Sequence, residues 1–476
     1  MALTTAEKKL PIGGEWIETG DWIEVRSPYS GEVVGRVARA GADETTRAID
    51  AAERAMREPL PAHKRAEILV RVAMGLGRRH DEVARLISDE AGKPIKAARV
   101  EAKRAMSTYT FAAVEARKLA GEMVPMDVAQ AGEGKLAFTL RRPIGIVAAI
   151  TPFNFPLNLV AHKLAPALAA SCAVVLKPAS QTPLSALLLA ELAEQAGLPP
   201  GWLNVVAGPS SEIGDALLED ERVKAVTFTG SGTVGWSLKA RAPRKKVNLE
   251  LGNATPLIVA GDADLDAAAA ATATNGFSFA GQSCISIQRV YVERAAYDGF
   301  LERLLPRVAK LKVGDPADEE TDVGPVIDEG AKERILDWIE EARSAGAEVP
   351  AGGGEQDGLI RPTVIAGAGP ELKVSCEEVF GPVVTVNSVS SLDEAIRLAN
   401  GTRYGLQAGI FTSGLETALR ATHELEFGGI TVNEAPTFRS DQMPYGGVKE
   451  SGNTREGPAY AVRELTEEHL VVINTA

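Results

Sequence analysis

The chain has 476 residues, more than one hydrophobic core usually serves, so two or more domains are expected. Hydrophobic residues make up 45% of it and charged residues 24%, which is typical of a globular protein. The 51 Lys and Arg against 64 Asp and Glu give a net charge of −13, which argues against a nucleic-acid-binding or anionic membrane-binding surface. We therefore expect a small-molecule partner, with no nucleic acid and no membrane.

No stretch reaches the apolar length of a membrane span, and the polar segment 1–10 has no signal-peptide core. The three cysteines, Cys172, Cys284 and Cys376, are too far apart to form a disulfide framework, so the cytoplasm is the expected compartment. The histidines lack metal-ligand spacing, and no metal site is expected.

Residues up to about 121 are expected to form a few short strands and then two helices, at 65–91 and 97–119, where apolar residues have helical spacing. The segment 124–142 alternates around the turn-like 132–134 and predicts a protruding hairpin. Such a hairpin could join the sheet of another subunit.

From residue 144 onward, short apolar strands alternate with helices, which predicts a parallel α/β sheet. The strands are expected at 144–150, 173–177, 203–206, 223–229 and 247–251, with helices such as 157–170 and 183–196 between them. Ligands bind beyond the carboxyl ends of such strands. The first candidates for a site are therefore 151–154, 177–180, 208–209, 230–231 and 250–252.

A G-x-G-x-x-G motif begins at Gly230, between a predicted strand and a predicted helix. Because glycines have no side chain, a pyrophosphate could approach the helix N-terminal amides beside Ser231. This fingerprint expects an acidic residue about 20 positions further on to hold the ribose, and Glu250 stands there.

Two other strand ends carry candidate groups. Lys177 and Ser180 could bind ribose hydroxyls or a phosphate, or Lys177 could be a solvated loop lysine. Asn154 stands between two aromatic residues and two prolines, where its amide could donate to an oxyanion. It could equally cap the following helix, and the spacing does not decide between the two.

Cys284 follows Gly281 in a small, polar stretch between a helix-like and a strand-like run. A reactive thiol would occupy such a position. Most free cysteines, however, are small buried hydrophobic residues, and this interpretation stays open on the local pattern.

Eight motifs together resemble the NAD(P)-dependent aldehyde dehydrogenase superfamily over nearly the whole chain. The overall pattern is similar to the branch that includes lactaldehyde, phosphonoacetaldehyde and non-phosphorylating glyceraldehyde-3-phosphate dehydrogenases. The motifs are FNFP at 153–156, KPAS at 177–180, FTGS with a later glycine at 228–235, ELG at 250–252, GQSC at 281–284, EEVFGPV at 377–383, YGL at 404–406 and PYGGVKESG at 444–452.

The resemblance implies covalent catalysis. Cys284 would attack the aldehyde as a thiolate, with Asn154 and the Cys284 backbone N–H binding the oxyanion. Hydride transfer would leave a thioester, and Glu250 would activate the water that hydrolyses it. The ELG motif thus moves Glu250 from the ribose to the role of base.

The resemblance also implies a binding site for NAD or NADP. Where the family often has Glu, this chain has Ser180, which permits NADP because no carboxylate repels a 2′-phosphate, and Lys177 could pair with that phosphate. NAD remains open. The implied cofactor-binding residues are Thr151, Pro152, Phe153, Lys177, Ser180, Gly230, Ser231, Leu251, Glu378 and Phe380.

The expected substrate is a small polar or acidic aldehyde, namely a hydroxyaldehyde or a semialdehyde, with phosphate-bearing aldehydes ranked lower because Ser283 stands where an arginine would hold a phosphate. Arg439 could recognise an anionic tail or form a surface salt bridge. His162 could line the substrate tunnel or make one structural hydrogen bond. The expected pocket comprises His162, Ser283, Arg439 and Tyr445.

Two alternatives come from other classes. A CoA-acylating semialdehyde dehydrogenase shares the fold and the thiol, but that branch typically lacks the glutamate base, so Glu250 favours water as the acyl acceptor. A non-catalytic dinucleotide-binding scaffold would not need Cys284, Asn154, Glu250 and Glu378 together.

For the fold, the resemblance implies a doubly wound, Rossmann-like α/β cofactor domain (1–121 and 143–252) and a second α/β catalytic domain (253–437). A small β oligomerisation arm (122–142 and 462–476) would contain the hairpin and a C-terminal strand at 468–474. Exposed strand edges favour pairing between subunits, so a homodimer or homotetramer is expected.

Overall fold

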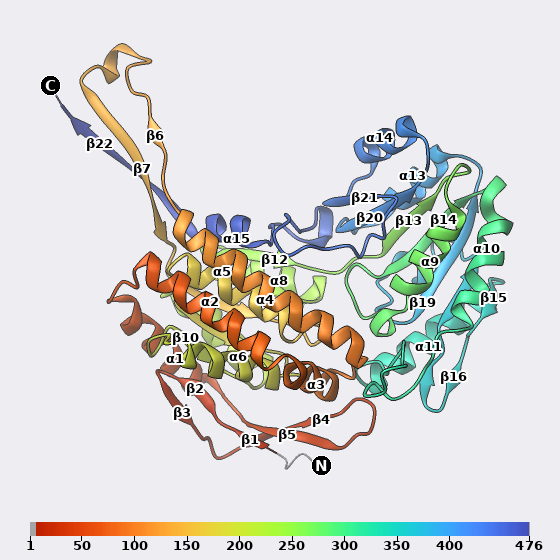
Figure 1. Cartoon of the computed structure of the whole chain (residues 1–476), viewed down its shortest axis with the longest axis horizontal. Helices are drawn as coiled ribbons and strands as arrows, with labels where there is room; N and C mark the ends of the chain where they lie inside the picture. The colour runs from red at the N-terminus through yellow and green to blue at the C-terminus, as the bar shows by residue number, and fades with distance from the viewer. Residues whose placement is uncertain (1–5, 476) are drawn as a thin grey trace.

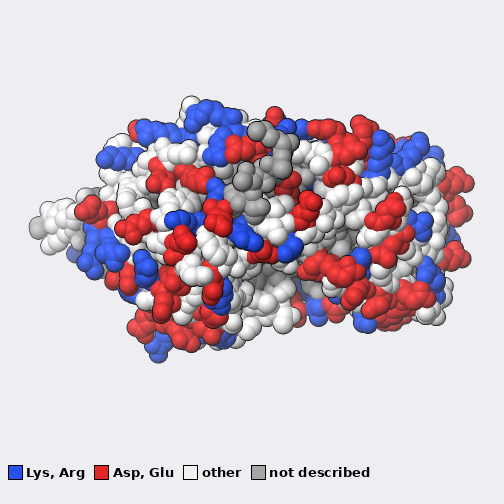
Figure 2. Space-filling view, turned by 90° about the horizontal axis from the view of Figure 1, so that it is seen from below, with Lys and Arg blue, Asp and Glu red and all other residues white. Residues whose placement is uncertain are grey.

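The computed structural model describes residues 6–475, which form two α/β lobes and a projecting arm (Figure 1). Residues 1–5 of the predicted first domain and residue 476 of the predicted arm lie outside the described residues. Among the described residues, no helix is both long and apolar enough to span a membrane. On the face shown in Figure 2, acidic and basic side chains are interspersed.

A parallel sheet of five strands, in the order β10-β9-β8-β11-β12, occupies the first lobe. The strands β8 and β9 are buried along their length because helices cover both faces, which explains why they are apolar up to the final Lys177. The predicted parallel α/β fold is therefore confirmed. The strands are β8 (Ile146–Ile150), β9 (Val174–Lys177), β10 (Leu203–Val205), β11 (Val223–Thr229) and β12 (Lys246–Glu250).

Helices pack around this sheet, and five short strands precede them. The helices are α1 (Ala42–Met56), α2 (Ala62–Arg78), α3 (His80–Ala91), α4 (Ile95–Lys118), α5 (Asn158–Ala169), α6 (Leu184–Gln195), α7 (Ser210–Glu219), α8 (Gly232–Arg241) and α15 (Pro458–Glu464). The strands are β1 (Ala6–Lys8), β2 (Leu10–Ile12), β3 (Glu15–Ile17), β4 (Trp22–Arg26) and β5 (Val33–Ala38).

The single helix expected at 65–91 is wrong, because α2 and α3 are separate helices. Arg79 lies between them with φ −108° and ψ 22°, outside the helical region. Its guanidinium donates to Glu82 in the first turn of α3, with an Nε to Oε2 distance of 2.8 Å. Neither glycine nor proline marks this break in the sequence.

The second lobe contains a sheet of seven strands, in the order β15-β18-β19-β14-β13-β20-β21, with only the edge strand β15 antiparallel. It has its own apolar core. The strands are β13 (Thr255–Val259), β14 (Ile287–Glu293), β15 (Glu348–Ala351), β18 (Thr363–Ala366), β19 (Val383–Val389), β20 (Gln407–Phe411) and β21 (Gly429–Val432).

The other elements of the second lobe are helices, short 3-10 turns and one small hairpin. They are α9 (Leu265–Asn275), η2 (Ser278–Gly281), α10 (Arg294–Val308), α11 (Glu329–Ser344), β16 (Glu355–Gln356), β17 (Leu359–Ile360), α12 (Lys373–Cys376), α13 (Leu392–Asn400), α14 (Leu415–Glu424) and η3 (Lys449–Ser451).

The arm is a three-stranded antiparallel sheet that projects away from both lobes (Figure 1). β7 (Lys135–Pro143) lies between β6 (Met123–Val124) and the C-terminal β22 (Thr466–Asn474), and the turn η1 (Gln130–Gly132) connects β6 to β7. The predicted hairpin and C-terminal strand thus form one sheet. β22 is one edge of it.

Candidate active site

Cys284 lies in the loop between η2 and β14, and the backbone before it is strained. Three consecutive residues ending at Gly281 have φ of 50°, 53° and 68°, in the left-handed region. A Cβ on Gly281 would lie 2.0 Å from the carbonyl oxygen of Gly381, so only glycine fits. This close approach fixes the loop against the segment that carries Glu378.

The Cys284 side chain is half-buried, and its Sγ lies 2.9 Å from the Tyr445 hydroxyl. Burial raises the pKa of the thiol to about 12. The hydrogen bond to Tyr445 and the charge of Arg439 lower this pKa, whereas the carboxylates of Glu378 and Glu250 raise it. The thiol therefore lies within range of four groups that control its ionisation.

Asn154 is buried just beyond β8, where its amide contacts the loop of the thiol. Its Nδ2 donates to the Gln282 backbone oxygen at 2.9 Å, and its Oδ1 is buried without a hydrogen-bond partner. The amide can donate a second hydrogen bond that the contact with Gln282 does not use. Asn154 does not cap α5 with its side chain, so the helix-cap interpretation is wrong.

Glu250, the last residue of β12, is buried, and neither carboxylate oxygen has a hydrogen-bond partner. Its Oε1 would lie 2.8 Å from a Cβ on Gly446, in the loop that also carries Tyr445. Burial raises the Glu250 pKa well above its usual value, and the charge of Glu456 adds to the effect. Arg439 and Lys163 oppose it.

A buried ion-pair network stands behind Glu250. Glu456 contacts Arg439 Nη2 at 2.8 Å and Lys163 Nζ at 3.3 Å. Burial alone would raise the Glu456 pKa, but Lys163 and Arg439 bring it down to about 2. Glu456 therefore keeps its charge, and Glu250 is the carboxyl group that takes up a proton first.

A cavity of about 700 Å³ lies where the two lobes meet, and it offers groups that suit a dinucleotide. From the first lobe, Ser231 and Gly232 begin α8, and Ser231 caps no backbone N–H with its side chain. From the second lobe, Glu378 accepts the Asn253 backbone N–H at 2.9 Å, and burial raises its pKa to about 7.

Of the other cofactor candidates, Phe153, Lys177 and Ser180 lie at the same edge of the first sheet, and Phe380 lies in the second lobe. None of them lines this cavity. Lys177 is buried, so a solvated loop lysine is wrong, and its Nζ contacts the Pro178 oxygen at 3.4 Å. Burial lowers the Lys177 pKa. Ser180 donates to the Gly208 oxygen at 3.2 Å. Phe153 and Phe380 pack edge to face, with ring centroids 5.8 Å apart.

Four further candidates follow the strands in the same way. Thr151 and Pro152 follow β8, Gly230 follows β11, and Leu251 follows β12. The Thr151 hydroxyl is buried without a hydrogen-bond partner. The Gly230 N–H donates to the backbone carbonyl oxygen of Glu250 at 3.1 Å, which joins two of these strand ends.

A second cavity, of about 200 Å³, reaches Ser283 beside the thiol and contains two cationic side chains. Lys93 is buried over the Phe155 ring, with its Nζ 3.7 Å from the centroid, and forms an ion pair with Glu101. Arg104 donates from Nη2 to Asp441 at 2.9 Å, while its Nε is buried without a partner. Sequence patterns gave no signal for either residue, because Arg104 lies within the helix α4 and Lys93 in the short loop before it.

His162 and Arg439 do not line this cavity, in contrast to the expectation. His162 lies in α5, with Nε2 3.1 Å from Asp441 and 3.4 Å from the Thr108 hydroxyl, and burial lowers its pKa to about 4. Arg439 is paired with Glu456, but the pair is buried, so a surface salt bridge is wrong. Tyr445 contacts the thiol directly.

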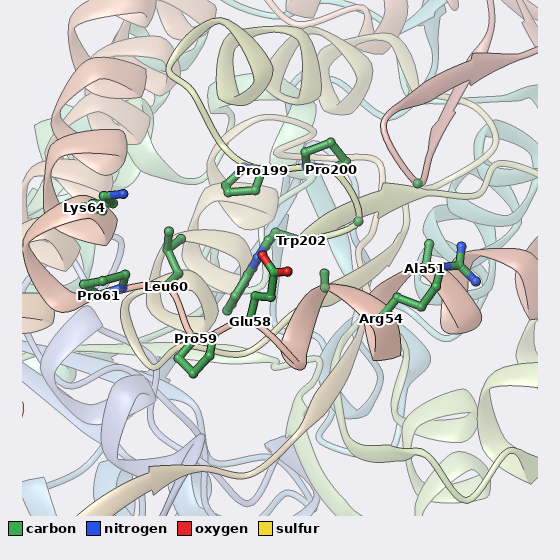
Figure 3. A pocket seen from close by; sticks show the side chains of 13 residues that line it. Ala51, Arg54, Glu58, Pro59, Leu60, Pro61, Lys64, Pro199, Pro200 and Trp202 are labelled. Atoms are coloured by element: carbon green, nitrogen blue, oxygen red, sulfur yellow. The ribbon is translucent and has the colours of Figure 1, made fainter.

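A third cavity, of about 420 Å³, lies in the first lobe, beside the C-terminal end of α1 and the N-terminal end of α2 (Figure 3). Trp202, Pro199 and Pro200 line it, together with charged side chains such as Arg54 and Lys64. None of the predicted site residues belongs to it.

The chain is similar to known proteins over nearly its whole length. A model of the aldehyde dehydrogenase family matches residues 16–471. A 3-sulfolactaldehyde dehydrogenase from Priestia aryabhattai is 44% identical over 465 residues, which cover 98% of each chain. A lactaldehyde dehydrogenase from Methanococcus maripaludis is 40% identical over 469 residues, which cover 97% of this chain and 99% of that protein.

Two solved structures superpose with a TM-score of 0.96. Aldehyde dehydrogenase 21 from Physcomitrella patens, in complex with the reaction product succinate, is 40% identical and covers 99% of both chains. NADP-dependent glyceraldehyde-3-phosphate dehydrogenase from Bacillus halodurans, complexed with NADP, is 36% identical, with 99% of this chain and 100% of that chain covered. The chain therefore belongs to the aldehyde dehydrogenase family and is an oxidoreductase that uses NAD or NADP.

Proposed function

We propose that the protein oxidises a small hydroxyaldehyde with an anionic tail to its carboxylate, through a cysteine thioester. The observation that carries this proposal is the cavity beside Cys284, where the Nε of Arg104 is buried without a partner and can donate to an anion, whereas the charge of Lys93 is balanced by its pair with Glu101. The similarity to a 3-sulfolactaldehyde dehydrogenase supports the same substrate class. A semialdehyde, whose tail is a carboxylate, is the next candidate.

In the first step, Cys284 attacks the aldehyde carbon as a thiolate, and the carbonyl oxygen becomes an oxyanion. Asn154 donates its free amide N–H to that oxyanion, since the contact with Gln282 already orients the amide. The backbone N–H of Cys284 is the second donor. The close packing of the preceding loop against Gly381 fixes the position of the thiol and of the Cys284 backbone N–H.

The cofactor supplies a nicotinamide that accepts the hydride from the aldehyde carbon. Glu378 would hold the ribose of the nicotinamide, Phe380 would position its ring, and the start of α8 at Ser231 would face the pyrophosphate. The strand-end residues 151–153 and Leu251 would complete this site. With Ser180 in place of an acidic residue, Lys177 can pair with a 2′-phosphate, so both cofactors are admitted.

In the second step, Glu250 takes a proton from the water that hydrolyses the thioester. Its raised pKa makes it a stronger base than an exposed glutamate, because burial and Glu456 disfavour its charged form. Because Glu456 is paired and stays charged, the proton that leaves the water goes to Glu250. Arg439 and Lys163 serve this network and not the substrate tail.

Water is the proposed acyl acceptor, and CoA is not favoured. Glu250 is present and buried beside the thiol, where a base for water is needed. The relatives at 44% and 40% identity are dehydrogenases of hydroxyaldehydes. A non-catalytic scaffold is likewise not favoured.

We also propose that the lobes act as a cofactor domain (1–121 and 143–252) and a catalytic domain (253–437), with the arm (122–142 and 462–476) for assembly. A homodimer or homotetramer in the cytoplasm is the expected form. Apolar side chains stay exposed along the arm, including Leu470 at 61% and Val472 at 47%, which supports a second copy as their partner.

The first test follows reduced cofactor at 340 nm with 3-sulfolactaldehyde, lactaldehyde and succinate semialdehyde, each with NAD and with NADP. We expect turnover with at least one anionic aldehyde, and none for Cys284→Ala. Glu250→Gln should give a burst of reduced cofactor that then stalls, because the thioester forms but is not hydrolysed. Full turnover of Cys284→Ala would refute the mechanism.

The tail site has its own test. Arg104→Met should raise KM for the anionic aldehydes about tenfold or more, the effect of one lost charge-assisted hydrogen bond, and should leave KM for lactaldehyde almost unchanged. Arg99→Met is the matched control, since Arg99 lies in the same helix and pairs with Glu319 at 2.6 Å on the surface. Equal effects on charged and neutral aldehydes would contradict an anion site at Arg104.

A further inference from the structure

Tyr445 holds a phenol hydroxyl against the Cys284 sulfur. The two atoms are 2.9 Å apart, and the tyrosine is 3% exposed. A backbone bridge fixes the residue, because the Tyr445 N–H donates to the Glu456 oxygen at 3.1 Å and the Glu456 N–H donates back at 2.6 Å. The steps proposed above do not use this hydroxyl.

Arg439 covers the ring of the same tyrosine. Its guanidinium carbon lies 3.8 Å from the ring centroid, and the side chain is 6% exposed. The contact with Glu456 at 2.8 Å anchors the guanidinium from its other side. A buried cation above the ring is attracted by the π electrons, and it draws electron density from the phenol, which makes the hydroxyl a stronger donor.

The charges around the sulfur explain why a donor is needed. Glu250 and Glu378 face the thiol from two separate segments, and both oppose a negative charge on it. Arg439 favours that charge. Beyond Arg439 lie its partner Glu456 and also Lys163, His162 and Asp441. The charge of Arg455 acts on Glu250 as well.

We propose that Tyr445 is a catalytic residue that donates its hydroxyl hydrogen to the Cys284 thiolate, and that Arg439 is the positioning residue that orients and strengthens this donor. A thiolate carries no proton, so in that state the hydroxyl must be the donor. In the neutral thiol either group can donate. The hydrogen bond therefore favours the state that attacks the aldehyde. This inference rests on the proposed role of Cys284 as nucleophile.

The test is the pH dependence of Cys284 alkylation by iodoacetamide, followed by mass spectrometry of the Cys284 peptide in the full-length protein. The reagent reacts with thiolate, so the rate rises through the pKa of the thiol. We expect Tyr445→Phe to move this profile upward by about one to two pH units, the effect of one hydrogen bond to a charged group, which below the thiol pKa appears as a rate about ten to a hundred times lower at the same pH. An unmoved profile would overturn the proposal.

Two controls separate this effect from loss of structure. Tyr291→Phe also removes a buried hydroxyl, but one that lies away from the site and accepts a hydrogen bond from Arg289 Nη1 at 3.2 Å. This variant should leave the profile unchanged. The half-buried Cys376 reports in the same samples on the reagent and on folding, and its alkylation should not differ between the variants.

Arg439 variants test the second part. Arg439→Gln removes the charge and the stacking cation, so it should move the profile in the same direction as Tyr445→Phe. The shift in the double variant should be smaller than the sum of the two single-variant shifts, because Arg439 acts partly through the hydroxyl. Full additivity would mean that Arg439 acts on the sulfur alone and would overturn its positioning role.

Failure of the proposed function looks different. If Cys284→Ala keeps its turnover, the nucleophile is misassigned, whatever the alkylation profiles show. If Cys284→Ala is inactive and Tyr445→Phe leaves the profile unmoved, only the role of Tyr445 is wrong.

Discussion

Both carboxylate oxygens of Glu250 are buried without a donor, so the folded protein disfavours the charged form of this residue. Its pKa is therefore higher in the folded than in the unfolded state. The folded state holds this proton more tightly, and stability is lost as pH rises from the unfolded pKa, about 4.3, through the folded one. Keeping Glu250 as a base that can act on water therefore lowers the stability of the folded protein at neutral pH.

Glu250→Gln should therefore stabilise the protein as it abolishes turnover. We expect equal unfolding temperatures near pH 4 and a higher one for the variant at pH 8, with about 1.4 kcal/mol for each unit of pKa shift removed. Thermal unfolding of both proteins at the two pH values measures this. A variant that is less stable at pH 8 would show that the carboxylate has a partner in solution.

Glu378 predicts a pH dependence for cofactor binding. Its pKa is raised to about 7 by burial, and only the carboxylate accepts hydrogen bonds from both ribose hydroxyls. Affinity for NAD, measured by calorimetry, should thus increase as pH rises through about 7. Glu378→Gln should bind weakly at every pH, and a variant that kept the pH dependence would show that another group controls binding.

At this scale, motifs predicted the residues at strand ends but not their neighbours. Asn154, Glu250 and Cys284 stand out because each follows or ends a predicted strand or follows a glycine turn. Arg104 and Glu456 have no such signal, since one lies within a helix and the other in a loop, and only tertiary packing brings them to the site. The same packing placed Arg439 in a buried ion pair and not in the lining of the cavity beside Ser283.

At the scale of elements, strands were easier to predict than the limits of helices. β11 has the predicted limits 223–229, because its apolar and β-branched residues stand between turns, with Lys224 as the exposed exception. The division between α2 and α3 has no comparable signal. At this break, Arg79 pairs with Glu82 in the first turn of α3, and no glycine or proline marks the position.

The turn before the nucleophile makes a prediction at the same scale. Gly281→Ala should reduce turnover and destabilise the protein by about 1–3 kcal/mol, because φ is +68° and a Cβ would overlap the Gly381 oxygen. Gly346→Ala is the matched control, since φ there is +93° and a Cβ would have nothing within 4 Å. Gly346→Ala should lose stability only because alanine disfavours a positive φ, and it should keep its turnover. Equal turnover in both variants would show that the loop tolerates displacement.

At the scale of the whole molecule, the arm is the part least explained by a single chain. β22 pairs with β7 over nine residues, yet Leu470, Val472 and Ile473 are 61%, 47% and 44% exposed. An apolar surface of this kind on a thin sheet favours burial against a second copy, as does the unpaired edge of β22. The sequence predicted the two strands, but the apolar surface becomes visible only when they are paired.

Deleting residues 468–476 should therefore give monomers or aggregates in size-exclusion chromatography with light scattering, because β7 would lose its partner and the shared edge. Leu470→Glu makes the sharper test, since it keeps β22 and places a charge on the proposed interface, so the oligomer should dissociate at low micromolar concentration. Leu415→Glu is the control, because Leu415 is 73% exposed at the start of α14, in the second lobe. If Leu470→Glu and the deletion both kept the wild-type mass, the arm would not mediate assembly, and the exposed apolar side chains would need another partner.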